Sequence, residues 1–332
     1  MRVALVGATG ETGTSVIDGL LKSSDGFVRT PTIHRPREFN ADWSLQDLTA
    51  LVRPSSLGKP AVEELKTRGV NVVSADLQGP QESLVRILKG IDVVISTIHY
   101  QALGDEIPLA TAAKAAGVKR YVPCFFATVA PKGIMHLRDV KEDVLCHVQR
   151  LYLPYTVIDI GWWYQIALPR VPSGRFDYAL LAPISYIFEG GETPIALTDV
   201  RDIGLYVAKI ISDPKTINQK VFAFSECLTQ NQVVKLVEKV SGEKVDSAKL
   251  SAKEIETSLS DIKRKDSDPV SQIQAMNEYW YSWGVRGDNS PEHAKYLGYL
   301  IAADLYPDLK GRSLETFVRE VADQKARKVY SQ

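Results

Sequence analysis

A glycine-rich segment close to the N-terminus constrains the fold of this chain more than any other feature. The apolar run Val3–Val6 leads directly into Gly-Ala-Thr-Gly-Glu-Thr-Gly over residues 7–13, and a helical pattern continues to Lys22. Glycine suits these positions because Gly7 permits a tight turn and Gly13 lets the helix pack closely on the strand. The segment predicts a buried strand, a sharp turn and a helix, which together open a parallel α/β sheet.

The middle of the same segment predicts a phosphate site. Gly10 has no side chain, so a pyrophosphate can approach the backbone, and the free amides at the start of the helix face it. We therefore expect the loop to bind a dinucleotide, the alternative being a glycine turn without a ligand. The expected binding residues are Gly7, Thr9, Gly10, Glu11, Thr12 and Gly13.

Short apolar runs alternate with helical patterns through the first half of the chain. This alternation is typical of a parallel sheet covered by helices on both faces, and it predicts a doubly wound α/β fold of the Rossmann type. After the first strand, the expected strands are Leu48–Val52, Val70–Ser74, Asp92–Thr97 and Arg120–Pro123, and the expected helices are Val62–Arg68, Gln81–Leu88 and Pro108–Ala116.

The second half of the chain has a different character. Strand-like runs remain at Thr156–Gly161 and Lys220–Phe224, but proline, glycine and aromatic residues become denser. Thr229 and Gln232 form a capping-box pattern at the start of a helix. The expected domains are a dinucleotide-binding Rossmann domain over residues 1–157 and a smaller, interleaved α+β substrate lobe over residues 158–332.

Residues 28–46 interrupt the alternation of strands and helices. A connection from a helix to the next strand normally takes about 2–6 residues, and removing this segment joins Phe27 to Asp47 at a natural junction. One interpretation is a surface insertion beside the adenine end of the cofactor site. The other is a translated intron, since a codon for Val28 begins with GT and a codon for Gln46 can end in AG.

Charge and cysteine content exclude several classes of protein. Forty Lys and Arg residues balance forty Asp and Glu residues, so no basic excess draws the chain to nucleic acid. Three scattered cysteines fit neither a disulfide framework nor a metal site, and they suit a reducing compartment. No signal peptide or membrane-spanning run is visible. We expect a cytoplasmic monomer or homodimer that binds no metal, nucleic acid or membrane.

The end of the second expected strand distinguishes NADPH from NADH. Arg53 follows this strand and Lys59 lies shortly after it, where an acidic residue would instead bind a ribose hydroxyl. A guanidinium binds a 2′-phosphate through two hydrogen bonds, so these cations favour NADPH; the alternative is a solvated charged loop. Thr97 ends the fourth expected strand, and Ile98 and His99 follow it at the edge where open sheets bind ligands. We expect these three residues near the nicotinamide.

Several segments together resemble the NmrA-like and isoflavone reductase-like family of atypical short-chain dehydrogenases. They are Gly7–Gly13, Ala50–Ser56 with Lys59, Val93–Ile98, Lys119–Pro123 and Leu153–Ile158. Three later segments, Gly161–Gln165, Leu197–Gly204 and Ser282–Leu300, resemble a fungal branch often associated with secondary metabolism. The resemblance implies a Rossmann fold, NADPH and a reductase activity.

The resemblance also implies a catalytic lysine on the helix before the Pro-Tyr-Thr strand. Lys141 lies thirteen positions before Pro154, which is the spacing that the family's reductases show. A lysine there can bind the nicotinamide ribose and act as a general acid or base, whereas the alternative is a surface lysine. His136 could share in proton transfer only if an irregular loop lies between it and Lys141, because residues five apart on a helix face different directions.

The expected substrate residues are mostly apolar. The family's usual Pro-Ser-Glu-Phe-Gly turn after the fifth strand is here Pro123-Cys124-Phe125-Phe126-Ala127, so Cys124, Phe125 and Phe126 give a more apolar wall. Adjacent aromatic residues in a strand point to opposite sides, so Trp163 or Tyr164 could line a cleft for a flat substrate. Packing between lobes is the alternative for these rings.

These features predict an NADPH-dependent reductase of a small, aromatic or polyketide-like metabolite. The reduced centre would be a carbonyl, an enone or a quinone-methide-like carbon. One alternative is an NmrA-like regulatory protein that senses NADP without turnover; in such sensors the lysine that Lys141 matches is typically missing. A non-redox isomerase or cyclase on the same scaffold is the other alternative.

Overall fold

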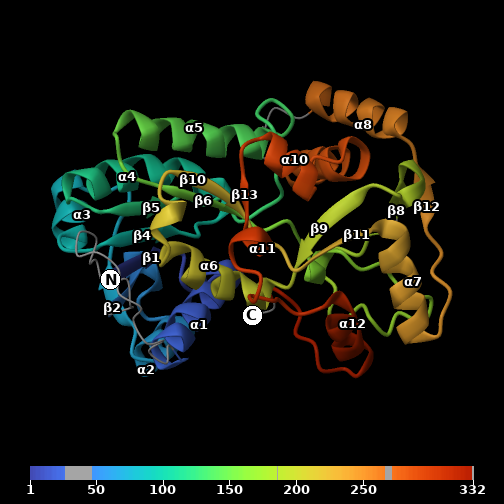
Figure 1. Cartoon of the computed structure of the whole chain (residues 1–332), viewed down its shortest axis with the longest axis horizontal. Helices are drawn as coiled ribbons and strands as arrows, with labels where there is room; N and C mark the ends of the chain where they lie inside the picture. The colour runs from blue at the N-terminus through green and yellow to red at the C-terminus, as the bar shows by residue number, and fades with distance from the viewer. Residues whose placement is uncertain (27–46, 185, 266–270, 331–332) are drawn as a thin grey trace. The chain divides into compact units, whose positions relative to one another are not determined.

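The computed structural model describes residues 1–26, 47–184, 186–265 and 271–330, so the interruption predicted at 28–46 lies outside the described residues. The chain divides into two compact units (Figure 1). Each unit is assembled from three separate stretches of the sequence. Unit 1 comprises Met1–Phe125, Asp143–Val157 and Ile203–Gln219, and unit 2 comprises Phe126–Glu142, Ile158–Asp202 and Lys220–Gln332.

Unit 1 contains a five-stranded parallel sheet with the order β3-β2-β1-β4-β5. The order reverses between β1 and β4, which confirms the predicted doubly wound topology. The strands are β1 (Arg2–Val6), β2 (Asp47–Val52), β3 (Asn71–Ser74), β4 (Val93–Ser96) and β5 (Arg120–Val122), and the helices are α1 (Glu11–Gly26), α2 (Pro60–Thr67), α3 (Gln81–Leu88), α4 (Glu106–Ala115) and α6 (Ile203–Ile211).

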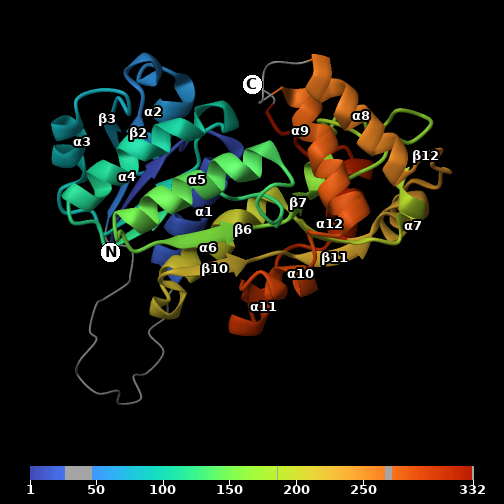
Figure 2. The same cartoon turned by 90° about the horizontal axis from the view of Figure 1, so that it is seen from above.

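Helices cover both faces of this sheet. Figure 2 shows α3 and α4 on one face and α1 and α6 on the other. The strands are apolar on both sides for this reason, and β1 is buried along its length except at Arg2. Helix α5 (His136–Arg150) begins in unit 2 and continues into unit 1, where Val148 packs in the core beneath α3 and α4.

Helices α1 and α6 approach each other at backbone distance. The amide of Gly204 donates a hydrogen bond of 3.0 Å to the hydroxyl of Ser15. A Cβ atom on Gly204 would lie 1.7 Å from the carbonyl oxygen of Ser15, and one on Gly19 would lie 2.1 Å from the carbonyl of Gly204. Glycine at both positions is therefore a packing requirement, because it lets α1 and α6 lie directly against each other.

Unit 2 contains smaller sheets and most of the remaining helices. By the ranges above it is no smaller than unit 1. The strand orders are β11-β9-β7, β13-β10-β6 and β12-β8. The strands are β6 (Thr156–Asp159, which begins in unit 1), β7 (Trp162–Trp163), β8 (Tyr186–Phe188), β9 (Pro194–Thr198), β10 (Gln219–Phe222), β11 (Glu226–Thr229), β12 (Ala248–Leu250) and β13 (Leu300–Ile301).

The helices of unit 2 pack around an aromatic core. That core includes Trp162, Tyr164, Phe188, Trp283 and Phe317. The predicted capping box is confirmed at the start of α7, where Thr229 and Gln232 bond each other's backbone amides. The helices are α7 (Gln230–Ser241), α8 (Ala252–Lys265), α9 (Gln272–Tyr279), α10 (Pro291–Tyr296), α11 (Ala302–Leu305) and α12 (Leu314–Ala322), with a π-helical segment, η7 (Trp280–Arg286), after α9.

Candidate active site

The glycine loop forms the sharp turn between β1 and α1 that its sequence predicts. Gly7 has a φ of 79°, and a Cβ atom there would lie 2.3 Å from the carbonyl oxygen of Thr97. A Cβ atom on Gly13 would lie 2.1 Å from the carbonyl oxygen of Gly7. Packing alone requires glycine at both positions, because real side chains do not approach backbone this closely.

Gly10 differs from the other two glycines because the protein leaves space beside it. Apart from its chain neighbours, the only described atom within 4 Å of a Cβ on Gly10 is the carbonyl oxygen of Gly7, at 3.5 Å. Thr9 and Gly10 are exposed, and Glu11 and Thr12 are half-buried in the first turn of α1. This free space at a helix N-terminus fits a phosphate group.

The residues after β4 lie beside the glycine loop. The Thr97 hydroxyl and amide both donate to the carbonyl oxygen of Val6, at 2.8 and 2.9 Å. Because the strand order reverses here, this is the edge where open sheets bind ligands. His99 is exposed, and its Nδ1 accepts a hydrogen bond of 3.4 Å from the amide of Gln101, which caps the short 3₁₀ turn that begins at Tyr100.

The two predicted phosphate cations are exposed. Arg53 directly follows β2 and Lys59 precedes α2. In the part of the chain that the structure describes, neither side chain forms an ion pair. Both cations are therefore available to bind an anion.

A buried carboxylate that the sequence analysis missed holds the turn after β5. Glu106, 1% exposed, accepts a hydrogen bond of 3.0 Å from the hydroxyl of Tyr121. It also accepts from the amide of Cys124, at 3.1 Å. The thiol of Cys124 in turn donates to the carbonyl of Ile98, at 3.3 Å. Burial, and then the neighbouring Glu106, raise the pKa of Tyr121 well above its ordinary value.

The structure therefore brings a predicted substrate residue, Cys124, into contact with a predicted cofactor residue, Ile98. The neighbouring phenylalanines are buried: Phe125 is 1% exposed in unit 1 and Phe126 is 6% exposed in unit 2. An acidic residue in the first turn of a helix is normally exposed and interacts favourably with the helix dipole. The sequence around Glu106 therefore gave no sign that its side chain is buried.

Lys141 lies on α5 in unit 2 and is only 8% exposed, which excludes the alternative of a surface lysine. Helix α5 begins at His136, so no irregular loop separates the two residues. At 3.6 residues per turn, positions five apart point about 140° away from each other. The condition for His136 to share protons with Lys141 is not met, and this part of the prediction is wrong.

A buried polar cluster anchors the turn of α5 that carries Lys141. Arg138, 2% exposed, donates to Asp159 at 2.9 Å and to the hydroxyl of Tyr299 at 2.5 Å. Its guanidinium also donates to Glu142 at 2.7 Å, and Tyr299 donates to Asp159 at 2.6 Å. Burial, and then the charge of Asp159, raise the pKa of Tyr299 well above its ordinary value, so it stays a hydrogen-bond donor.

The predicted aromatic lining residues have different environments. Trp163 is half-buried and stacks on Tyr330 with ring centroids 6.2 Å apart. Tyr164 is fully buried, stacks on Phe317, and donates from its hydroxyl to Glu226 at 3.0 Å. Tyr164 is thus a core residue, which corrects its expected place in a cleft. The pKa of its hydroxyl is raised, first by burial and then by Glu226.

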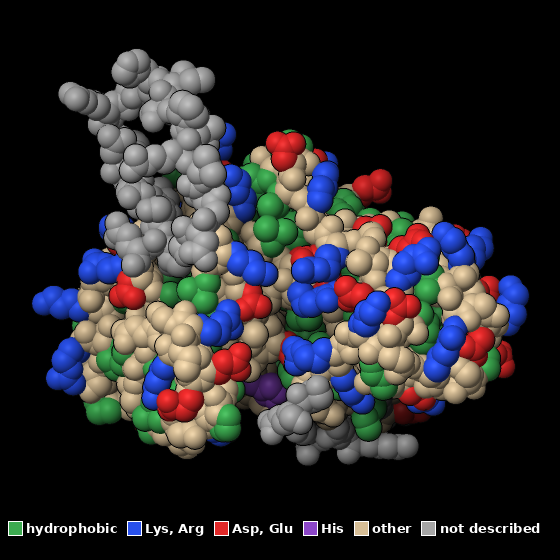
Figure 3. Space-filling view, turned by 90° about the horizontal axis from the view of Figure 1, so that it is seen from below, with side chains coloured by type: hydrophobic (Ala, Val, Ile, Leu, Met, Phe, Trp, Pro, Cys, Tyr) green, Lys and Arg blue, Asp and Glu red, His purple; other side chains and the backbone are tan. Residues whose placement is uncertain are grey.

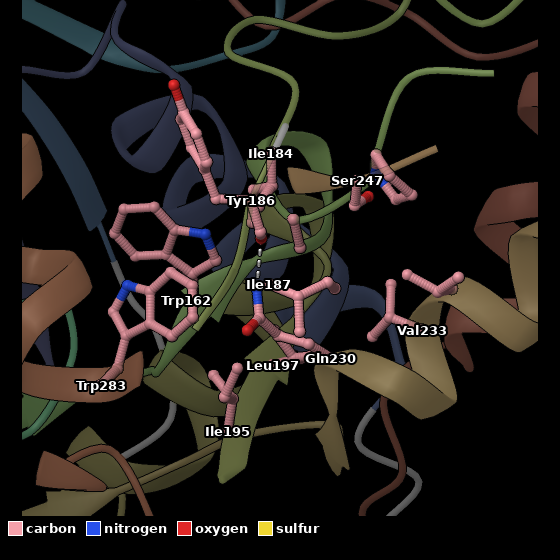
Figure 4. Close-up of a pocket in the computed structure, with 13 residues that line it drawn as sticks. Trp162, Ile184, Tyr186, Ile187, Ile195, Leu197, Gln230, Val233, Ser247 and Trp283 are labelled. Carbon is pink, nitrogen blue, oxygen red and sulfur yellow. Dashed lines mark hydrogen bonds between the residues drawn. The ribbon is translucent and has the colours of Figure 1, made fainter. Parts of the chain in front are cut away.

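Two tryptophans, Trp162 and Trp283, line a pocket together with Tyr186 (Figure 4). Their rings lie 5.7 Å apart, beside the amide of Gln230, which donates to the carbonyl of Tyr186 at 3.1 Å. The cavity measures about 20 Å³ and lies within unit 2. A cavity of this size has room for about one water molecule, so it is too small for an aromatic metabolite.

No helix in the described ranges combines the length and the apolar character needed to cross a membrane. Within the same residues, no group of three or more His, Cys, Asp or Glu side chains is arranged to hold a metal ion. On the face shown in Figure 3, Lys and Arg side chains lie among Asp and Glu side chains.

Comparison with known proteins supports the predicted family in sequence and in fold. The signature of the NmrA-like family matches residues 1–290. Asnovolin J 5′,6′-dehydrogenase of Aspergillus novofumigatus is 46% identical over 331 residues, covering 97% of this chain and 96% of that protein. Phenylcoumaran benzylic ether reductase of Nicotiana tabacum is 28% identical, covering 96% and 97%.

A solved structure shares the fold over almost the whole chain. Leucoanthocyanidin reductase from Vitis vinifera, solved as a binary complex with NADPH, has a TM-score of 0.77 and 21% identity. The match covers 97% of this chain and 100% of that one. The relatives are thus named as reductases and a dehydrogenase, as the predicted resemblance implies.

Proposed function

Because this chain belongs to the NmrA-like family, we propose that it is an NADPH-dependent reductase of a small aromatic or polyketide-like metabolite. The observation that carries the proposal is the free space beside Gly10, which packing does not require. Gly7 and Gly13 serve the turn itself, whereas Gly10 gives room to a pyrophosphate. The exposed cations Arg53 and Lys59 favour a cofactor that has a 2′-phosphate.

The cofactor would supply a hydride to a carbonyl, enone or quinone-methide-like carbon. Lys141 would donate or relay the proton that the reduced oxygen or carbon needs. The names of the relatives support this class of chemistry, since one relative is named as the reductase of a benzylic ether. The turn at Cys124, whose side chain is half-buried, would give the substrate an apolar wall.

A second candidate is the reverse reaction. The relative with 46% identity is named a 5′,6′-dehydrogenase, so the same residues could bind NADP⁺ and accept a hydride from the metabolite. Lys141 would then take up a proton instead of donating one. The direction is decided by assaying aryl enones with NADPH and their saturated forms with NADP⁺.

The test of the proposal is Lys141→Ala, assayed by the absorbance change of the nicotinamide with aryl ketones and aryl enones. We expect turnover to fall by roughly 10²–10⁴ if Lys141 transfers the proton. Lys235→Ala, which removes an exposed lysine from α7, should leave the rate unchanged. Equal rates for Lys141→Ala and the parent protein would remove Lys141 from the mechanism. Tight NADPH binding without oxidation by any metabolite would favour the sensor.

A further inference from the structure

Helix α5 begins without a capping side chain of its own. The amide of Asp139 bonds the carbonyl of Met135, at 3.0 Å, so Met135 occupies the N-cap position. A thioether is a poor hydrogen-bond acceptor, whereas most helices begin with Ser, Thr, Asp or Asn. The first amides of α5 therefore need an acceptor from elsewhere in the protein.

Glu278, at the end of α9, supplies that acceptor. Its Oε2 accepts a hydrogen bond of 2.7 Å from the amide of His136, the first residue of α5. Its Oε1 accepts from the side-chain amide of Gln274, one turn earlier on α9, at 2.9 Å. Glu278 and Gln274 are 3% and 7% exposed, so the contact is buried. A carboxylate at a helix N-terminus also complements the positive end of the helix dipole.

The contact connects the aromatic region around α9 with the helix α5, which carries Lys141. Glu278 immediately precedes Tyr279, whose ring lies 5.1 Å from that of Trp162, and the π-helical segment η7 follows. Lys141 lies less than two turns beyond His136, on the same helix. Glu278 therefore links α9 to the beginning of the helix that carries Lys141.

We propose that Glu278 is a positioning residue: it caps α5 from α9 and thereby fixes Lys141 for proton transfer. This inference rests on the proposed function. The Arg138 cluster described above holds the same turn through side chains, whereas Glu278 holds it through the backbone. Glu278 contacts neither the reacting atoms nor the cofactor in this proposal, so its effect depends entirely on Lys141.

The test compares Glu278→Ala, which removes the acceptor, with Glu278→Gln, which keeps one acceptor oxygen for the amide of His136 and loses the charge and the second acceptor oxygen. Thr229→Ala is the matched control, because it removes the cap of α7, which carries no proposed catalytic residue. Amide hydrogen exchange of residues 137–142 should accelerate about tenfold or more in Glu278→Ala, as expected for a lost cap. It should change little in Glu278→Gln and not at all in Thr229→Ala.

Activity with aryl enones gives the second readout. Glu278→Ala should lower kcat at least tenfold with little change in the KM for NADPH, and Glu278→Gln should restore most of kcat. In the Lys141→Ala background, removing Glu278 should have no further effect, because the group that it positions is gone. If Glu278→Ala does not fold, Glu278→Asp takes its place, since it withdraws the carboxylate by about 1.5 Å and keeps its charge.

The outcomes separate this inference from the proposed function. Unchanged exchange over residues 137–142 in Glu278→Ala would overturn the capping role, whatever the assays show. Faster exchange with an unchanged kcat would overturn the link to Lys141. An equal loss of kcat in Thr229→Ala would mean a general loss of stability and would also overturn it. If Lys141→Ala alone leaves turnover unchanged, that result would instead overturn the proposed function.

Discussion

Replacing Gly10 by alanine tests whether the glycine loop binds a ligand or is only a tight turn. The added methyl would lie 3.5 Å from the carbonyl oxygen of Gly7, an ordinary contact that needs no rearrangement. Alanine is a poorer N-cap than glycine by up to about 1 kcal/mol, but it also restricts the unfolded chain by about 0.4–1 kcal/mol. These terms oppose each other, so the free energy of unfolding should change by less than about 1 kcal/mol.

Cofactor binding should respond much more strongly to the same methyl group. It fills the space that a pyrophosphate would occupy, and loss of one or two charge-assisted hydrogen bonds costs about 1.5–3 kcal/mol each. The affinity for NADPH, measured by quenching of tryptophan fluorescence, should therefore fall by roughly 10- to 100-fold or more. Unchanged affinity in a folded Gly10→Ala protein would refute the reasoning, because it would leave the loop as a turn without a ligand.

Gly13→Ala is the matched comparison for this experiment. Its methyl would lie 2.1 Å from the carbonyl oxygen of Gly7 and 2.8 Å from the Cα of Ala8. Backbone atoms cannot move aside as a flexible side chain can, so this variant should lose about 1–3 kcal/mol of stability or more. Urea unfolding of both variants distinguishes the two kinds of glycine.

Three further predictions follow from packing and charge. Gly204→Ala would place a methyl 1.7 Å from the carbonyl of Ser15, so the melting temperature should fall by several degrees; an unchanged melt would contradict the close packing of α1 and α6. Arg53→Glu should weaken NADPH binding at least tenfold relative to NADH without a change in stability, and an unchanged preference would assign the phosphate to other residues. Burial opposes ionisation of Asp92, but Lys119 and Arg2 outweigh burial and lower the pKa of its carboxyl group. The ionised carboxylate therefore stabilises the fold fully at pH values above its ordinary pKa of 3.8. This contribution is lost as the pH falls through the lower pKa of the folded protein. The stability difference between parent and Asp92→Asn, from urea unfolding, should therefore be larger at pH 5 than at pH 2; a constant difference would contradict this sign.

The parts of the fold that could be predicted are those encoded by neighbouring residues. The helix Gln81–Leu88 and the capping box at Thr229 were predicted from spacing alone, and the structure confirms both. The return of Ile203–Gln219 to unit 1 could not be predicted, because its contact with α1 joins residues far apart in the sequence. A glycine such as Gly204 gives no sign of which helix it will meet.

The candidate site shows the same limit. The glycine loop, Thr97 and the burial of Lys141 follow from motifs with fixed spacing. Glu106 and Glu278 did not stand out, because a single acidic residue on a helix is normally exposed, and only the tertiary structure buries these two. Tyr164 was predicted in a cleft because alternation along a strand does not tell which side faces the core.

The close contact between α1 and α6 has a consequence for how the protein is made. About 185 residues separate the end of α1 at Gly26 from the end of α6 at Ile211, and synthesis at about 5–20 residues per second takes on the order of ten to forty seconds to add them. During that interval the nascent chain exposes the glycine face of α1 around Gly19. A fragment ending at Val157 would keep that face open permanently, so the dinucleotide-binding half matures only when translation of the chain is well advanced.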